Sequence, residues 1–145
     1  MKRIVSGVLI VLLSAMFLIP GGATAAVLMD LQKLKRTNAC SGCDLSYANL
    51  YGADLRGADL DGANLQGTNL YGANLSGATL EKANLRGANL SRAGLQGTDL
   101  EGADLQGANL RKSNLQGAAL KDAKLGGAVW TDGTRCKTGA IGECK

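Results

Sequence analysis

A leucine recurs at every fifth residue over more than half of the chain. Leucine occupies position 45 and each fifth position through 125, which makes 17 leucines, and Trp130 takes the eighteenth place. Two residues before each of these 18 positions stands a small residue, which is alanine in 14 cases. This period fits no ordinary element. On an α-helix the leucines would spread around the cylinder, and on a straight strand they would alternate between the two faces.

A short extended piece followed by a corner does fit the period. Within one pentad the small residue and the leucine are two positions apart, so an extended backbone points both to the same side. Glycine stands two residues after the leucine in 12 of the 17 pentads, and its backbone freedom suits a sharp corner. Repeating this unit winds the chain into a coil with alanine and leucine inside. We therefore expect an all-β solenoid whose coils stack by backbone hydrogen bonds.

The pentads resemble the pentapeptide-repeat family, whose motif is A(D/N)LXX. The resemblance extends from Cys43 to about Val129. It implies a right-handed quadrilateral β-helix with four pentads per coil, hence about 4.5 coils over residues 43–130. The outward positions agree with a coil of four pentads, because the acids that directly follow a leucine recur at every fourth pentad: Asp61, Glu81 and Glu101.

The N-terminal residues 1–25 are predicted to be a secretory signal peptide. Lys2 and Arg3 precede an apolar run that ends at Pro20, and the small residues that follow predict cleavage after Ala25 or Ala26. An uncleaved membrane anchor is the alternative. Export by the Sec route would place the protein in the periplasm, or in the thylakoid lumen of a photosynthetic source. Similar C-terminal tails and CxxC openings occur in exported pentapeptide-repeat proteins of cyanobacteria.

The mature chain would carry little net charge. Removing the two basic residues of the signal peptide, which has no acid, changes the formal charge from +4 to +2. A charge this small predicts no strong electrostatic partner. It argues against nucleic-acid binding and against topoisomerase protection by DNA mimicry.

Both ends of the repeat are predicted to be covered. Residues 26–42 would form a short cap helix and lead-in, with Leu28, Leu31 and Leu34 on the side that lies over the first coil. A membrane-surface helix is the alternative for this segment. Residues 131–145 would form a C-terminal cap, with the large Trp130 side chain closing the last coil.

The four cysteines are expected to form disulfides, because export leads to an oxidising compartment. The two ends of the repeat are ~20 Å apart at ordinary strand spacing, whereas a disulfide needs Cα atoms within ~7 Å. Local pairing follows, as Cys40–Cys43 and Cys136–Cys144. A zinc site of four thiolates is disfavoured by the same distance. A redox role for Cys40 and Cys43 remains as an alternative.

Nothing in the sequence predicts an enzyme. The chain has no histidine, no nucleotide-binding motif, and a narrow core that leaves no room for a substrate. We expect no catalytic residue, cofactor or metal site, and no membrane association after cleavage. The function predicted is an exported structural or protein-interaction module, with the thiol–disulfide redox protein as the alternative. The sequence names no partner and no oligomeric state.

One face of the coil is the candidate for docking. With four pentads per coil, two tyrosines and three basic residues fall on the same face, and they could anchor and orient a partner protein. The alternative is a solvated surface whose asparagines bond to their own backbone. The docking candidates are Tyr51, Tyr71, Arg92, Arg111 and Lys112, the asparagines are Asn49, Asn69, Asn89 and Asn109, and the opposite face carries Asp59, Asp61, Glu81, Asp99 and Glu101.

Overall fold

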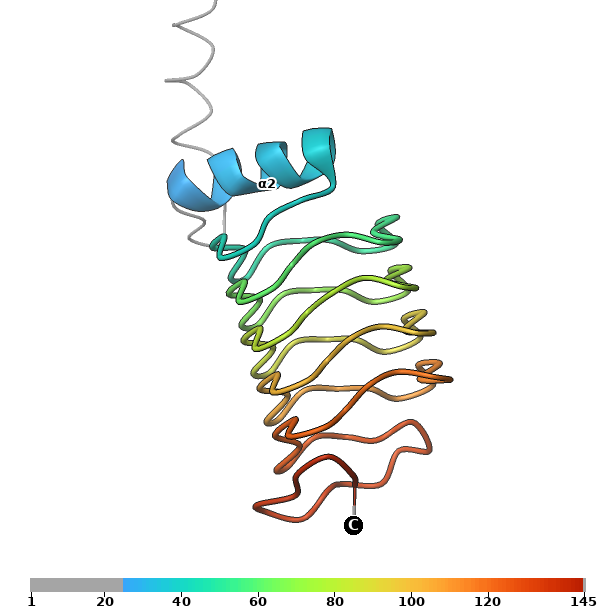
Figure 1. Ribbon diagram of the computed structural model, residues 1–145. Helices are drawn as coiled ribbons and strands as arrows, with labels where there is room; N and C mark the ends of the chain where they lie inside the picture. The colour runs from blue at the N-terminus through green and yellow to red at the C-terminus, as the bar shows by residue number, and fades with distance from the viewer. Residues whose placement is uncertain (1–24, 145) are drawn as a thin grey trace, which may run out of the picture.

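The computed structural model describes residues 25–144 as a stack of coils with one helix lying across its N-terminal end (Figure 1). The helix, α2, spans Ala25–Thr37, and the chain ends at the other end of the stack. Residues 1–24 of the predicted signal peptide lie outside the described part. Among the described residues, no helix has both the length and the apolar character needed to cross a membrane.

The coils pair through regularly spaced parallel bridges. Each bridge joins positions four pentads apart, from Ala39 with Asp59 to Asn109 with Val129. From Leu45 to Leu110, each leucine N–H donates to a carbonyl of the following coil, as Leu45 does to Asn64 at 2.8 Å. In residues 25–144 the pairing consists of isolated bridges rather than continuous strands. Each coil therefore takes four pentads, and corresponding positions of successive coils become neighbours in a column.

The corners between pentads need a left-handed backbone. At Leu45–Ala48 the Ala48 N–H donates to the Leu45 carbonyl at 3.1 Å, and the third residue of such a turn takes a positive φ. Glycine adopts this angle freely, as Gly107 does at +68°. A residue with a side chain costs about 1 kcal/mol there. Five pentad corners nevertheless hold other residues, namely Tyr47, Lys82, Arg92, Lys112 and Asp122.

The interior consists of leucines with small residues between them. Most of these side chains are fully buried. The two threonines at small-residue positions keep their hydroxyls bonded, since Thr68 and Thr98 donate to the carbonyls of Leu45 and Leu75 at 2.8 Å. A polar group can therefore replace alanine inside the coil without being left unsatisfied.

Helix α2 packs on the first coil. Val27 and Leu34 are buried, whereas Leu28 and Leu31 are only partly buried. The buried stripe thus begins one residue before the predicted Leu28, because Val27, Leu31 and Leu34 follow the i, i+4, i+7 spacing of one helical face. The helix ends where Asn38 takes a φ of +54° and its N–H donates to the Leu34 carbonyl, which is a common way to end a helix.

The paired backbone begins one pentad earlier than the sequence pattern indicated. The first bridge is at Ala39 rather than at the predicted start, Cys43. The reason is that Cys40 stands one pentad before Leu45 and takes a leucine place, where it is fully buried. Cys43 occupies a small-residue place, as the sequence predicted, and it is 6% exposed.

The C-terminal tail covers only part of the last coil. The chain turns after Trp130 and runs back antiparallel, with bridges between Val129 and Arg135 and between Lys124 and Ile141. Leu125 is buried under this tail. Leu115 and Leu120 are only half-buried, and their N–H groups have no backbone acceptor within residues 25–144. One side of the last coil therefore remains open.

Candidate functional site

The predicted docking face contains a column of stacked side chains. Tyr51 and Tyr71 hold the same place in successive coils, and their rings are parallel with centroids 5.4 Å apart. The guanidinium carbon of Arg92 lies 5.9 Å from the centroid of the Tyr71 ring, within the range of a cation–π contact. Tyr51 is 66% exposed, so the stack presents an aromatic surface to solvent.

Three cations gather beside this stack. A shallow depression of about 360 Å³ is lined by Tyr71, Ser91, Arg92, Arg111 and Lys112. The structure thus brings four of the five predicted docking residues around one depression, and the fifth, Tyr51, stacks on Tyr71. The presence of the cluster does not test docking, which stays a prediction.

The three cations of this depression form no ion pair within the described part of the chain. Among residues 25–144, the ion pairs involve Arg56, Lys82, Arg86 and Lys121, each with an aspartate or glutamate. A second depression of similar volume shows the contrast, because its arginine, Arg56, pairs with Asp54 at 2.7 Å. The positive charge of the first depression is therefore available to an outside ligand.

The asparagine column on the same face has a structural role. The Asn49 Oδ1 accepts the Tyr51 N–H at 3.2 Å, and the Asn109 Oδ1 accepts the Arg111 N–H at 3.1 Å. Asn69 also donates from its Nδ2 to Asn49 Oδ1 at 3.2 Å. These bonds hold the corners and leave the asparagines as supports of the face.

The acidic face opposite is partly neutralised within the chain. Lys82 pairs with Glu81, and Lys121 pairs with Glu101 at 2.7 Å. The Asp61 carboxylate accepts the N–H of Glu81 at 2.9 Å. Much of this face is therefore occupied by local contacts.

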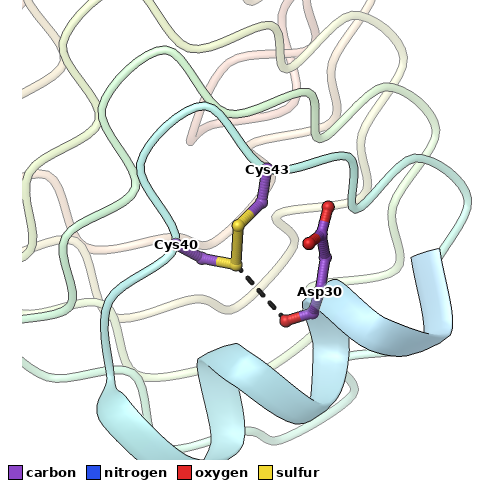
Figure 2. Close-up of side chains that lie close together, drawn as sticks. All are labelled: Asp30, Cys40 and Cys43. Atoms are coloured by element: carbon purple, nitrogen blue, oxygen red, sulfur yellow. Dashed lines mark hydrogen bonds between the residues drawn. A yellow bond between two sulfur atoms is a disulfide. The ribbon is translucent and has the colours of Figure 1, made fainter. Parts of the chain in front are cut away.

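The Cys40–Cys43 disulfide lies next to α2, on the side of the helix that faces the first coil (Figure 2). Its sulfurs are 2.13 Å apart, and its Cα atoms are 5.2 Å apart. Cys40 Sγ lies 3.3 Å from the Asp30 carbonyl oxygen, and the Lys33 ammonium lies 3.7 Å from Cys43 Sγ. The predicted pairing is therefore the one found, and two helix residues accompany it.

Asp30 and Lys33 were not anticipated from the sequence. Asp30 is the only acid within Ala25–Thr37, and this isolation inside an otherwise basic segment was the available signal. Its Oδ2 accepts the Asp44 N–H at 2.8 Å. The Asp30 carboxylate thereby accepts a hydrogen bond from a backbone N–H of the first coil. This N–H needs such an acceptor because no earlier coil provides a carbonyl for it.

The second predicted disulfide is also present. Cys136 and Cys144 are joined with sulfurs 2.09 Å apart, and they fasten the end of the tail. The described residues contain no free cysteine.

Comparisons with known proteins identify the repeat. The family model for pentapeptide repeats matches eight copies, over residues 40–77, 68–107 and 88–127. Comparison with curated protein sequences finds no significant match. A crystal structure of a pentapeptide repeat protein from the cyanobacterium Cyanothece 51142 has 37% sequence identity and a TM-score of 0.69, covering 71% of this chain and 84% of that chain.

Two further solved structures match with lower TM-scores. HetL, a pentapeptide repeat protein involved in heterocyst differentiation regulation from the cyanobacterium Nostoc sp. Strain PCC 7120, has 37% identity and a TM-score of 0.36, covering 67% of this chain and 53% of that chain. A pentapeptide repeat protein from the Arabidopsis thaliana thylakoid lumen has 26% identity and a TM-score of 0.43, covering 84% of this chain and 92% of that chain. The predicted resemblance is confirmed, and the chain belongs to the pentapeptide repeat family.

Proposed function

We propose that this protein is an exported, non-enzymatic interaction module that binds an acidic segment of a partner protein. The observation that carries this proposal is the group of three cations without acidic partners, Arg92, Arg111 and Lys112, next to the Tyr51–Tyr71 stack. Pentapeptide repeat proteins are generally structural or interaction modules, which supports a role without catalysis.

The body of the module would be a right-handed quadrilateral β-helix of about 4.5 coils. The regular bridges between successive coils support four pentads per coil. We infer that α2 caps the first coil, since its Leu34 is buried and its Asp30 carboxylate accepts a hydrogen bond from the Asp44 N–H of that coil. The C-terminal tail would act as the second cap. The apolar N-terminal segment supports export to the periplasm or to a thylakoid lumen.

Two of the basic residues on the docking face occupy corners at which glycine is usual. Arg92 and Lys112 stand at corners with φ of +59° and +60°, in the column where Gly52 and Gly72 occupy the earlier corners. A side chain costs about 1 kcal/mol at each of these corners. Other side chains occupy such corners too, as Lys82 does. Arg92 and Lys112 differ from Lys82 because both line one depression and neither forms an ion pair within residues 25–144.

Electrostatics and aromatic area together define the partner. Carboxylates bind guanidinium groups through paired hydrogen bonds, and exposed tyrosine rings are favourable anchors at protein interfaces. A segment with several carboxylates and an aromatic side chain would satisfy both parts of the face. Opposite charge would also speed the encounter, and this effect weakens as salt is added.

Glycine substitutions test the charge without straining the corners. The double variant Arg92→Gly/Lys112→Gly removes two cations and leaves the residue that these corners normally hold. Lys82→Gly is the matched control, because Lys82 has a φ of +56° but pairs with Glu81 on another face. Binding would be measured by fluorescence anisotropy with a synthetic Glu-rich peptide containing tyrosine, and with a neutral Gln-for-Glu version.

We expect the acidic peptide to bind the native protein and Lys82→Gly alike, and to bind the double variant about tenfold more weakly or worse. Added salt should weaken the native complex. Tyr51→Ser/Tyr71→Ser should weaken binding at high salt as well. Equal binding of the neutral peptide, or full binding by the double variant, would refute an acidic partner.

The redox protein remains a second candidate because of one contact. The Lys33 ammonium near Cys43 Sγ would favour the thiolate of that cysteine after reduction. Both sulfurs belong to buried residues, however, which restricts the access that thiol–disulfide exchange requires. The reduction potential of the Cys40–Cys43 pair distinguishes a redox-active disulfide from a structural one. A value far below the potential of the compartment means that the disulfide is structural.

A further inference from the structure

Three possible metal ligands meet between α2 and the first coil (Figure 2). A carboxylate oxygen of Asp30 and the sulfurs of Cys40 and Cys43 all lie within 4.8 Å of one another. Both cysteines are buried and Asp30 is partly buried, so the group sits at an interface shielded from most of the solvent.

We propose that the reduced Cys40–Cys43 pair, together with Asp30, forms a binding site for a divalent cation of the zinc class, and that the disulfide closes this site in the oxidised protein. Two thiolates and one carboxylate are donors that Zn²⁺ accepts in tetrahedral sites, with water in the fourth position. Two cysteines separated by two residues are also the common spacing of a zinc half-site. A bound cation would link Asp30 of α2 to the first coil, whereas the disulfide joins two residues of that coil to each other.

The opening step requires a reductant, for which a small dithiol is the suitable chemical class, because both cysteines are buried and leave little access. Two electrons and two protons pass from the dithiol to the disulfide, the Cys40–Cys43 S–S bond breaks, and two thiols form while the dithiol is oxidised to its own disulfide. Binding of the cation then releases both thiol protons to solvent, since thiolates are the ligands. In the oxidised protein the Cys40 Sγ lies 3.3 Å from the main-chain carbonyl oxygen of Asp30, which is not one of the three proposed ligand atoms.

The carboxylate is held in place before any cation arrives. Its Oδ2 accepts the Asp44 N–H at 2.8 Å, and ligating carboxylates are commonly oriented by such hydrogen bonds. The same bond suggests a purely structural role for Asp30, in which it only satisfies a free amide. Asp30→Asn separates the two roles, because an amide oxygen can still accept that N–H but is a much weaker ligand for Zn²⁺.

The position of Lys33 is compatible with the site. Its ammonium lies 3.7 Å from Cys43 Sγ and would be repelled by a bound cation. The Lys33 side chain is exposed, so the ammonium can turn into solvent when the cation binds.

Cobalt titration of the full mature chain tests the proposal, because Co²⁺ bound by thiolates shows a sulfur-to-metal absorption band. The reduced native protein and reduced Cys136→Ser/Cys144→Ser should each bind one equivalent of Co²⁺ with this band. Reduced Cys40→Ser/Cys43→Ser and the oxidised native protein should not. Reduced Asp30→Asn should bind at least about tenfold more weakly, whereas the matched control Asp132→Asn should bind normally.

A second measurement needs no cysteine variant and covers the case in which one fails to fold. Zn²⁺ should slow the alkylation of Cys40 and Cys43 in the reduced native protein, read by mass spectrometry, and leave Cys136 and Cys144 unprotected. Equal protection of both pairs would overturn the proposal. Equal cobalt affinity of native protein and Asp30→Asn would also overturn it, since the carboxylate would then be no ligand.

Discussion

Two leucines in the same column should differ sharply in their contribution to stability. Leu80 and Leu120 hold the same place in their coils, because they are 40 residues apart and each coil takes 20 residues. Leu80 is 1% exposed, and its N–H donates to the Asp99 carbonyl at 2.8 Å. Leu120 is half-buried, and its N–H has no backbone acceptor in the part of the chain described. Replacing each by alanine compares a closed interior with an open end.

The magnitudes follow from burial. Leu80→Ala removes a fully enclosed side chain and leaves a cavity between two coils, which costs about 3–5 kcal/mol in the free energy of unfolding. Leu120→Ala removes a side chain that is partly exposed to water in the folded protein. At ~0.8 kcal/mol for each buried methylene, its loss should be about 1–1.5 kcal/mol. The difference of about 2–3.5 kcal/mol is well above the error of the measurement.

The assay is urea unfolding followed by circular dichroism, with hydrogen exchange to detect separate opening of the last coil. Leu125→Ala is the matched control, because Leu125 also lies in the last coil but is buried under the tail. Its loss should approach that of Leu80→Ala. Similar losses for Leu80→Ala and Leu120→Ala would refute the reasoning and would mean that something covers this side in solution. Repeating the measurement at two protein concentrations would detect self-association as the cover.

Two further predictions concern polar groups. Thr98→Val should lower stability by about 0.5–1.5 kcal/mol in urea unfolding, because the shape is kept and one buried hydrogen bond of 2.8 Å is lost, while the Leu75 carbonyl still accepts the Ala78 N–H at 2.9 Å; an unchanged midpoint would show that this hydroxyl contributes no net stability. The Ser46 hydroxyl and amide and the Asn64 amide, which donate to the Asp44 carboxylate, hold its pKa below the ordinary value of 3.8. A lowered pKa in the folded state stabilises the fold above the ordinary pKa, and this contribution is lost as the pH falls below that value. Acid unfolding monitored between about pH 5 and pH 2, compared with Asp44→Asn, checks the sign, since the variant should show a shallower loss of stability.

The sequence alone predicts the repeat, because the repeat depends only on residues a few positions apart in the chain. A small residue and a leucine two positions apart must share a side, and a glycine after them permits the corner. The start of the repeat was placed one pentad too late, because its first leucine place is occupied by Cys40 instead of a leucine. Counting back one pentad from Leu45 would have placed it. The segment predicted as cap helix and lead-in, residues 26–42, contains α2 at Ala25–Thr37, but the buried stripe starts at Val27 rather than Leu28, because packing decides the rotation of a helix on its support.

The candidate sites show a similar division. The five docking residues could be assigned to one face once four pentads per coil were assumed, and the family resemblance supplied that number. The strain at Arg92 and Lys112 and the lack of ion pairs for them within residues 25–144 emerged only from the backbone angles and contacts. Asp30 could not be placed at all, because its distance from Cys40 and Cys43 depends on how α2 crosses the coil.

By itself, then, the sequence determined which residues face inward and that the chain must coil, because a five-residue unit with glycine corners has no other way to bury its leucines together. The tertiary structure decided which residues meet. Tyr51 stacks on Tyr71 because each coil takes four pentads and the next coil lies directly on it. Asp30 meets the two cysteines because α2 packs on the open end of the first coil. Contacts between distant positions depend on the geometry of stacking and docking, which no local pattern encodes.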